Sequence, residues 1–201
     1  MNKLILSSLI LFSGQGFAAD LPKRLVIIGD SITEGYGVTR EEAYPSLLQK
    51  KISAAGKNWV VVNAGVSGST SASAVSRMNW QVKQKPDLIL LELGGNDGLR
   101  GLPAKAMEDN LAAAIVVAQR KSISVILMGI QVPPNYGKEY PKDFVQVFPR
   151  LAKKFKVPLI PFFLENVAGE KSLNQADGIH PNALGHARVA DNVFRAIEKS
   201  L

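Results

Sequence analysis

Apolar residues gather in five short runs along the chain, and polar or glycine-rich stretches separate them. β-Branched residues are frequent in these runs, which cover Leu25–Ile28, Trp59–Val62, Leu88–Leu93, Ser124–Ile130 and Val157–Phe163. All but the last lack a clear alternation of apolar and polar positions. Strands that are covered on both faces of a sheet have this pattern. We therefore predict five strands of a buried sheet.

The stretches between these runs are long enough for helices, and several carry apolar residues on one helical face. Ala104–Arg120 shows a clear 3.6-residue pattern, and the pattern over 144–155 contains Pro149, which predicts a kinked or shortened helix. The predicted helices are Glu41–Ala55, 71–83, Ala104–Arg120, 144–155 and Asn182–Lys199. Strand and helix thus alternate five times, which predicts an α/β fold with one parallel sheet between layers of helices.

The first residues have the pattern of an export signal. Lys3 gives a positive start, Leu4–Phe12 is an apolar stretch, and small residues at Gly16 and Ala18 suit cleavage after Ala18 or Ala19. A membrane-anchoring helix is the alternative, but this run is shorter than the ~20 residues that cross a bilayer. We predict a signal peptide over 1–19, one domain over 20–201, and a periplasmic or secreted protein.

Composition narrows the classes of function. A chain of 201 residues with 46% hydrophobic residues suits a single domain with a sizeable core. The absence of cysteine excludes thiol nucleophiles and cysteine-based metal sites. The net charge is +7, or 7 − 1 = +6 once Lys3 is removed. Because the basic residues are dispersed, we expect no nucleic-acid partner. The positive charge favours transient contact with anionic lipid surfaces. We also expect a monomer.

The segments that follow the predicted strands are dense in glycine, serine, asparagine, aspartate and histidine. They read "GDSITEGYG", "NAGVSGST", "GGNDGLRG", "QVPPNYG" and, before the last helix, "DGIHPNALGH". Ligands of open parallel sheets bind beyond the carboxyl ends of the strands, so these segments should converge at one edge. A serine hydrolase needs a serine, a base and an acid that orients the base. Ser31, His180 and Asp177 supply these groups, with Asp177 three residues before His180.

An oxyanion that develops on the substrate needs hydrogen-bond donors as well. The backbone N–H of Ser31, the backbone of Gly68 and the side-chain amide of Asn96 are candidates, and each such donor is worth ~2.7–4 kcal/mol of barrier. Asp30 adjoins Ser31 but would point the other way on an extended segment. We therefore predict that Asp30 braces its loop and is not the acid of the triad.

Other polar residues of these segments have simpler interpretations. Asp97 and Arg100 are predicted to be structural or rim residues, and His186 to be a satisfied histidine on the apolar face of the last helix. Asp177 and His180 form a poor zinc site because the chain offers neither a third histidine nor a cysteine.

Four blocks of the sequence resemble those of the SGNH (GDSL-type) hydrolases, in the same order. They are "GDSITEGYG", "GVSGST", "GGNDGLRG" and "DGIHP", and the likeness spans roughly residues 24–195. "LELGGNDGLRGLP" and "PPNYG" are most similar to the bacterial thioesterase, arylesterase and lysophospholipase subgroup. Two departures, Ile32 in place of leucine and Ser69 where many relatives carry aspartate, remove no catalytic group.

The resemblance implies a three-layer α/β/α, flavodoxin-like fold with a five-stranded parallel sheet. It implies Ser31 as nucleophile, His180 as base, Asp177 as its partner, and an oxyanion hole of Ser31, Gly68 and Asn96, with no metal or cofactor. By analogy with the subgroup, the acyl group of a small-molecule or lipid ester would lie near Leu99, Leu102 and Pro134. The expected activity is hydrolysis of carboxylic esters or thioesters; a carbohydrate deacetylase and a non-catalytic envelope ligand-binding protein are the alternatives.

Overall fold

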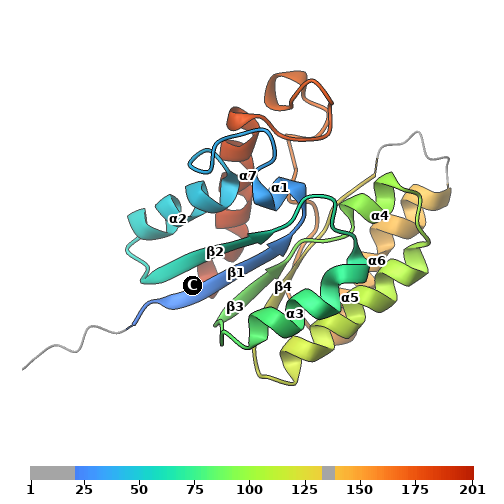
Figure 1. Ribbon diagram of the computed structural model, residues 1–201, viewed down its shortest axis with the longest axis horizontal. Coiled ribbons are helices and arrows are strands. Elements are labelled where there is room, and N and C mark those ends of the chain that lie inside the picture. Colours follow the sequence, from blue (N-terminus) through green and yellow to red (C-terminus); the bar gives the residue numbers. More distant parts are fainter. Residues whose placement is uncertain (1–20, 133–138) are drawn as a thin grey trace, which may run out of the picture.

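Five parallel strands form one sheet in the computed structural model, which describes residues 21–132 and 139–201 (Figure 1). The order of the strands across the sheet is β2-β1-β3-β4-β5, which is the flavodoxin-like order. Their bounds are Lys23–Gly29 for β1, Trp59–Gly65 for β2, Leu88–Leu91 for β3, Ser124–Met128 for β4 and Leu159–Ile160 for β5. The predicted parallel sheet is confirmed. The predicted signal peptide over 1–19, its cleavage positions and Pro134 lie outside the described residues.

Three predicted strands are shorter in the structure than their apolar runs. β3 ends at Leu91 and β4 at Met128, and the apolar residues that follow them enter the loops at the carboxyl edge. The difference is largest at β5, which keeps only Leu159 and Ile160 of the predicted run. Pro158 and Pro161 flank this strand, and neither has a backbone N–H to donate to a neighbouring strand.

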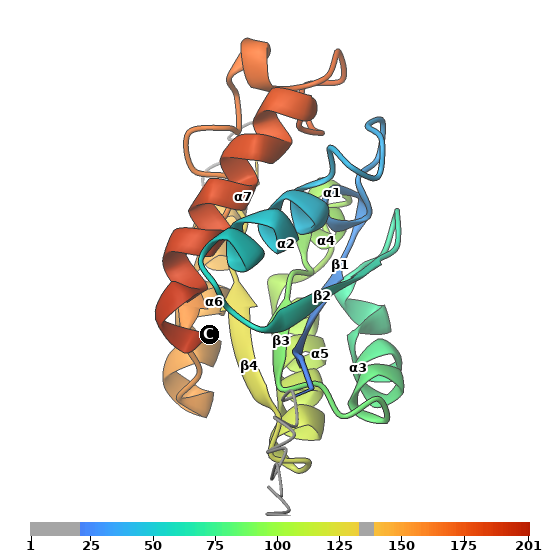
Figure 2. The same ribbon diagram turned by 90° about the vertical axis from the view of Figure 1, so that its left-hand side faces the viewer.

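Helices cover both faces of the sheet, which gives the predicted three layers (Figures 1 and 2). α2 and α7 pack together on one face, whereas α5 packs between α3 and α6 on the other. The longer helices are α2 (Tyr44–Ala54), α3 (Ala74–Val82), α5 (Ala104–Gln119), α6 (Glu139–Phe155) and α7 (Ala183–Ile197). The 3-10 helices η1 (Ser71–Ser73) and η3 (Lys171–Leu173) lie in the connections, and η4 (Glu198–Ser200) directly follows α7. None of the helices among the described residues is long and apolar enough to cross a membrane.

α6 continues through Pro149, so the proline does not shorten the helix. A proline within a helix removes one backbone hydrogen bond. The buried side chains on the same helix compensate for this loss, because they anchor both halves of α6 to the core. They are Phe144, Val147, Phe148 and Leu151.

Two short helices that periodicity does not reveal follow directly on strands. α1 (Ser31–Glu34) begins two residues after β1 ends, and α4 (Gly95–Leu99) comes soon after β3. Each has too few residues for a 3.6-residue pattern. They place Ser31 and Asn96 at the carboxyl edge of the sheet.

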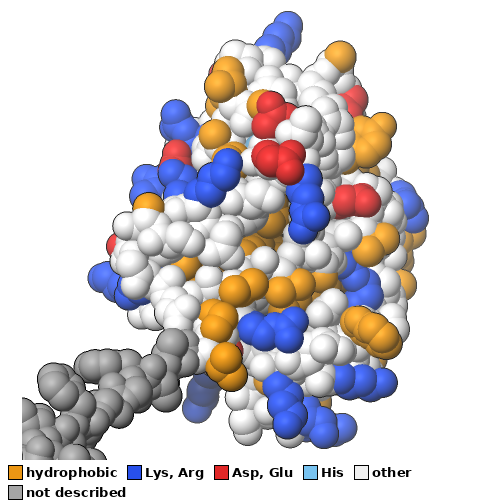
Figure 3. Space-filling view, turned by 60° about the vertical axis from the view of Figure 1, so that its left-hand side comes forward, with side chains coloured by type: hydrophobic (Ala, Val, Ile, Leu, Met, Phe, Trp, Pro, Cys, Tyr) orange, Lys and Arg blue, Asp and Glu red, His pale blue; other side chains and the backbone are white. Residues whose placement is uncertain are grey.

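The free edge of β2 carries an apolar groove between this strand and α3. Its apolar lining comes from Val62, Ala64, Val66 and Trp80, and Figure 3 shows apolar side chains along this face with acidic residues confined to its upper part. None of the residues that line this groove lines the cavity at the carboxyl edge, which is described below.

Candidate active site

Ser31 is held in a tight turn between β1 and α1. Asp30 caps the helix, because its Oδ1 accepts a hydrogen bond of 3.0 Å from the backbone N–H of Ile32. Gly35 ends α1 in the left-handed conformation with φ 94°. The turn leaves no room at Gly29, where an added Cβ would lie 2.0 Å from Oγ1 of Thr33. This geometry fixes the side chain of Ser31 at the edge of the sheet.

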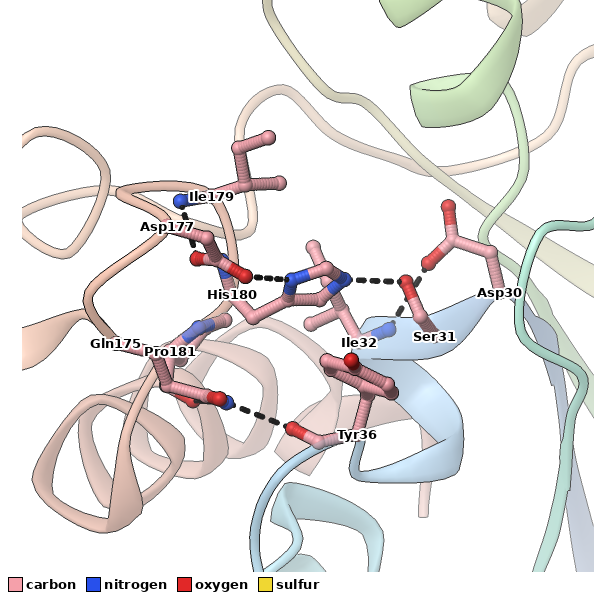
Figure 4. Close-up of polar contacts among 9 residues, drawn as sticks. All are labelled: Asp30, Ser31, Ile32, Tyr36, Gln175, Asp177, Ile179, His180 and Pro181. Carbon is pink, nitrogen blue, oxygen red and sulfur yellow. Dashed lines mark hydrogen bonds and ion pairs between the residues drawn. The ribbon is translucent and has the colours of Figure 1, made fainter.

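The side chains of Ser31, His180 and Asp177 form a continuous hydrogen-bonded chain (Figure 4). Oγ of Ser31 lies 2.9 Å from Nε2 of His180, although the two residues are 149 positions apart in the sequence. Nδ1 of His180 lies 2.6 Å from Oδ2 of Asp177. Because a carboxylate accepts hydrogen bonds, this contact assigns the proton of the neutral imidazole to Nδ1 and leaves Nε2 free to accept from Ser31.

Asp177 is ionised because the loop around it supplies hydrogen-bond donors. Burial alone would raise its pKa, but the backbone N–H and ring of His180 and the backbone N–H of Ile179 outweigh that effect and lower the pKa to about 2. The two backbone donors bind Oδ1 at 2.9 and 3.0 Å, so Oδ2 remains available for the imidazole. The carboxylate therefore both closes its own loop and orients His180.

The predicted oxyanion donors are only partly brought together. Asn96 stands in the first turn of α4, and its Nδ2 donates to Oδ2 of Asp30 at 3.4 Å and to the carbonyl of Ser69 at 3.1 Å. Asn96 and Ser31 line the same cavity. Gly68 has φ 75° and lies in the exposed loop next to Ser69, outside the residues that line the cavity. The contact from Asn96 to Ser69 thus ties this loop to α4.

A cavity of about 470 Å³ opens beside Ser31 and His180. Leu99 lines it as predicted, whereas Leu102 is not among the lining residues and is 37% exposed. Further apolar lining comes from Ile32, Ile130, Val132, Phe162, Leu164, Ala168 and Ile179. The sequence did not predict that these residues line the cavity. Ile130 and Phe162 nevertheless come just after strands, where ligands of such sheets bind. The lining suits an apolar group placed against a few polar residues.

A buried polar cluster that the sequence analysis missed supports the turn of Ser31 from beneath. Oε2 of Glu92 accepts from the backbone N–H of Asp30 at 3.1 Å and from Oγ1 of Thr33 at 2.7 Å. Thr33 also pairs with the hydroxyl of Tyr44 at 2.7 Å. Burial raises the pKa of Asp30 to about 6, and burial together with the nearby Asp30 raises that of Glu92 well above its ordinary value. Glu92 is hard to find in the sequence because it stands inside an apolar run.

The predictions for Asp30, Asp97 and Arg100 agree with the structure. Asp30 braces its loop through Ile32 and does not contact His180 by a hydrogen bond. Asp97 is buried and accepts from the backbone and hydroxyl of Ser71 at 2.8 and 2.5 Å. Arg100 donates to the carbonyl of Gly68 at 3.1 Å. These residues brace the loops around the cavity.

His186 is fully buried at the contact between α7 and the start of α2. Its Nδ1 accepts from the backbone N–H of Tyr44 at 3.3 Å, and the two rings stack with centroids 6.3 Å apart. Burial lowers the pKa of His186 to about 4, so the ring is neutral at pH 7. The predicted burial is confirmed, but the prediction that the ring is satisfied is wrong for Nε2, which is buried without a hydrogen-bond partner among the described residues. Within the described residues, His, Asp and Glu side chains do not gather in groups of three or more that could hold a metal ion.

Comparison with known proteins places these features in a known family. Residues 27–188 match the GDSL-like Lipase/Acylhydrolase family. Esterase TesA of Pseudomonas aeruginosa is 39% identical over 205 residues, covering 100% of both chains. Thioesterase 1/protease 1/lysophospholipase L1 of Escherichia coli K12 is 40% identical over 191 residues, covering 94% of this chain and 89% of that protein. The crystal structure of TesA matches with a TM-score of 0.86 and 40% identity, covering 89% of this chain and 100% of that chain.

Proposed function

Because the chain belongs to the GDSL-like lipase/acylhydrolase family and is a carboxylic ester hydrolase, we propose that it acts through an acyl-enzyme on Ser31. The observation that carries this proposal is the contact of 2.9 Å between Oγ of Ser31 and Nε2 of His180, continued by 2.6 Å to Asp177. A nucleophile, a base and an orienting acid in this geometry are what acyl transfer requires.

In the first half of the reaction, Oγ of Ser31 attacks the carbonyl carbon of the ester or thioester while Nε2 of His180 takes its proton. The tetrahedral intermediate collapses, the bond to the leaving alcohol or thiol breaks, and His180 returns the proton to that group. In the second half, Nε2 takes a proton from water, the resulting hydroxide attacks the acyl carbon, and the proton returns to Ser31 as the acid leaves. Asp177 stabilises the imidazolium in both halves.

The negative oxygen of each tetrahedral intermediate needs donors that already point at it. We assign this role to the backbone N–H of Ser31 and the side-chain amide of Asn96, since both residues line the cavity. The oxyanion would replace Oδ2 of Asp30, the more distant of the two present acceptors of Asn96 at 3.4 Å. Gly68 is the third proposed donor, and the contacts from Asn96 to Ser69 and from Arg100 to Gly68 hold its loop next to α4. The acyl chain would follow the apolar lining that includes Leu99.

The substrates we propose are aryl, acyl and lysophospholipid esters and thioesters, following the names of the relatives, which include an arylesterase of Vibrio mimicus. We also propose export to the periplasm or the exterior, on the pattern of residues 1–19. A monomer with no cofactor would suffice, because all the proposed groups come from one chain. The basic surface suits brief contact with an anionic membrane surface, where lysophospholipids are found.

Hydrolysis of p-nitrophenyl esters of graded chain length tests this proposal, with Ser31→Ala as the matched variant. The wild type should turn over the esters, and Ser31→Ala should lose all but a residual rate. Equal turnover by both proteins would remove Ser31 from the mechanism, and no turnover by the wild type would favour a ligand-binding protein. Release of acetate from an acetylated sugar, measured with the same two proteins, tests the deacetylase alternative, which the apolar lining of the cavity disfavours.

A further inference from the structure

A second route of hydrogen bonds joins the backbone of Ser31 to the backbone of His180, apart from the bond between their side chains. The carbonyl of Ser31 accepts from the N–H of Tyr36 at 3.0 Å. The carbonyl of Tyr36 accepts from Nε2 of Gln175 at 2.7 Å, and the N–H of Gln175 donates to the carbonyl of His180 at 2.8 Å. Figure 4 shows the Gln175 side chain reaching across to the Tyr36 loop.

We propose that Gln175 is a positioning residue, which sets the distance between Ser31 and His180 and so the rate of proton transfer between them. The proposal rests on the proposed function, because it assumes that these two residues exchange a proton. Gln175 does not line the cavity and would not touch the substrate, so it acts only through the two loops that it joins.

The amide of Gln175 fits this place chemically. Its Nε2 has two protons, one for the carbonyl of Tyr36 at 2.7 Å and one for the carbonyl of Pro181 at 2.9 Å. Since both partners are acceptors, only the amide nitrogen can face them. The other side of the amide packs on Gly37, where an added Cβ would lie 2.1 Å from Oε1 of Gln175. An apolar side chain of similar length could pack on Gly37, but it could not donate the two hydrogen bonds.

Few other contacts could replace this link. Between residues 30–44 and 174–186, the side-chain hydrogen bonds of the described residues are the Ser31–His180 contact, the Gln175–Tyr36 contact and the one from Tyr44 to His186. The last of these joins α2 to α7. Tyr36 is 53% exposed and its ring lies 4.7 Å from that of His180, so this loop has little burial to hold it. A displacement of about 1 Å between reacting groups can cost about 10²-fold in rate.

The first test replaces Gln175 by methionine, which has similar length and no N–H donors. Gln49→Met is the matched control: the amide of Gln49 also joins two segments, through the carbonyl of Trp59 at 3.0 Å and the N–H of Val61 at 2.7 Å, but between α2 and β2. We expect Gln175→Met to lose about 10²-fold in kcat with KM within threefold, because the cavity wall is unchanged. Gln49→Met should keep kcat within twofold of the wild type, although its Tm should fall at least as much as that of Gln175→Met.

A p-nitrophenyl phosphonate that labels the nucleophile serves as the second readout, since its rate of reaction depends on Ser31 and His180 but not on deacylation. Gln175→Met should slow labelling by the same factor as kcat. A wild type labelled at Ser31 together with a Gln175→Met variant within threefold in kcat and labelling rate would overturn the positioning role and leave the proposed function standing. A wild type that is not labelled at Ser31 would overturn the proposed function, and the positioning role with it.

A double-mutant cycle with Gly37→Ala approaches the same contact from the other loop. The new Cβ would displace the amide of Gln175, and the strain of alanine at φ 78° is the same in both backgrounds and cancels in the cycle. We expect the kcat losses of Gly37→Ala and Gln175→Met to be strongly non-additive, since both variants break the same link between the two loops. Losses that multiply would contradict the proposal.

Discussion

Replacing Asp177 by asparagine changes one atom at the centre of the proposed mechanism. Asparagine keeps Oδ1, which accepts the backbone N–H groups of Ile179 and His180 at 2.9 and 3.0 Å, so the loop should keep its shape. It places an NH₂ group where Oδ2 now lies, 2.6 Å from Nδ1 of His180. Two donors cannot share that contact. The imidazole must therefore move its proton to Nε2, which can then no longer accept the proton of Ser31.

The expected cost is about 10⁴-fold in kcat, which corresponds to about 5.4 kcal/mol of barrier, with KM nearly unchanged. Stopped assays on p-nitrophenyl butyrate between pH 5 and pH 9 measure it. Because the pKa of Asp177 is about 2, the wild-type carboxylate stays ionised over this whole range, and its protonation contributes nothing to any loss of activity on the acid side. Asp177→Asn activity within tenfold of wild type would refute the assignment of Asp177 as the orienting acid.

Three further predictions concern the donor, the cavity wall and the buried histidine. Asn96→Ala should lower kcat by about 10²–10³-fold at similar KM, because it removes one oxyanion donor; a loss confined to KM would contradict that role. Leu99→Trp should lower kcat/KM for decanoyl relative to butyryl esters, whereas Leu102→Trp, outside the cavity, should leave the ratio unchanged; equal ratios in both variants would argue against this acyl site. The pKa of His186 is about 4 in the folded protein, so the unfolded chain binds its proton first as the pH falls, and folding stability is lost between about pH 6.5 and pH 4. Urea unfolding should show this loss, up to about 3 kcal/mol, in the wild type but not in His186→Gln, and an identical pH dependence of both would refute it.

Much of the fold could be predicted because its signals are local. The apolar runs mark the strands, and the helical patterns mark the layers that cover them. β1, β3 and β4 are mostly buried as predicted, whereas the edge strand β2 is largely half-buried or exposed. What could not be predicted depends on context. α6 passes through Pro149 because buried side chains hold it on both sides, Phe144, Val147 and Phe148 before the proline and Leu151 after it. The short β5 is different, because the flanking Pro158 and Pro161 are a local signal that the sequence carries.

At the active site, too, some features have a local signal in the sequence and others depend on the fold. Ser31 and His180 could be proposed to meet because each stands where a parallel sheet presents its loops, and the structure places them 2.9 Å apart. The buried cluster beneath them could not be predicted. In the sequence, Glu92 is a single acidic residue inside an apolar run, and only the fold brings it into contact with Asp30 and Thr33. Gln175 has no local signal either, since its partner at Tyr36 is 139 positions away.

In the proposed mechanism, the hydroxyl of Ser31 becomes acylated during turnover. Rapid acid quench of the wild type with a slowly hydrolysed p-nitrophenyl ester, followed by peptide mass spectrometry, tests it directly. We expect one acyl group per chain, on the peptide that contains Ser31, and none in Ser31→Ala. An acyl group on a different residue, or undiminished turnover without any labelled peptide, would contradict it.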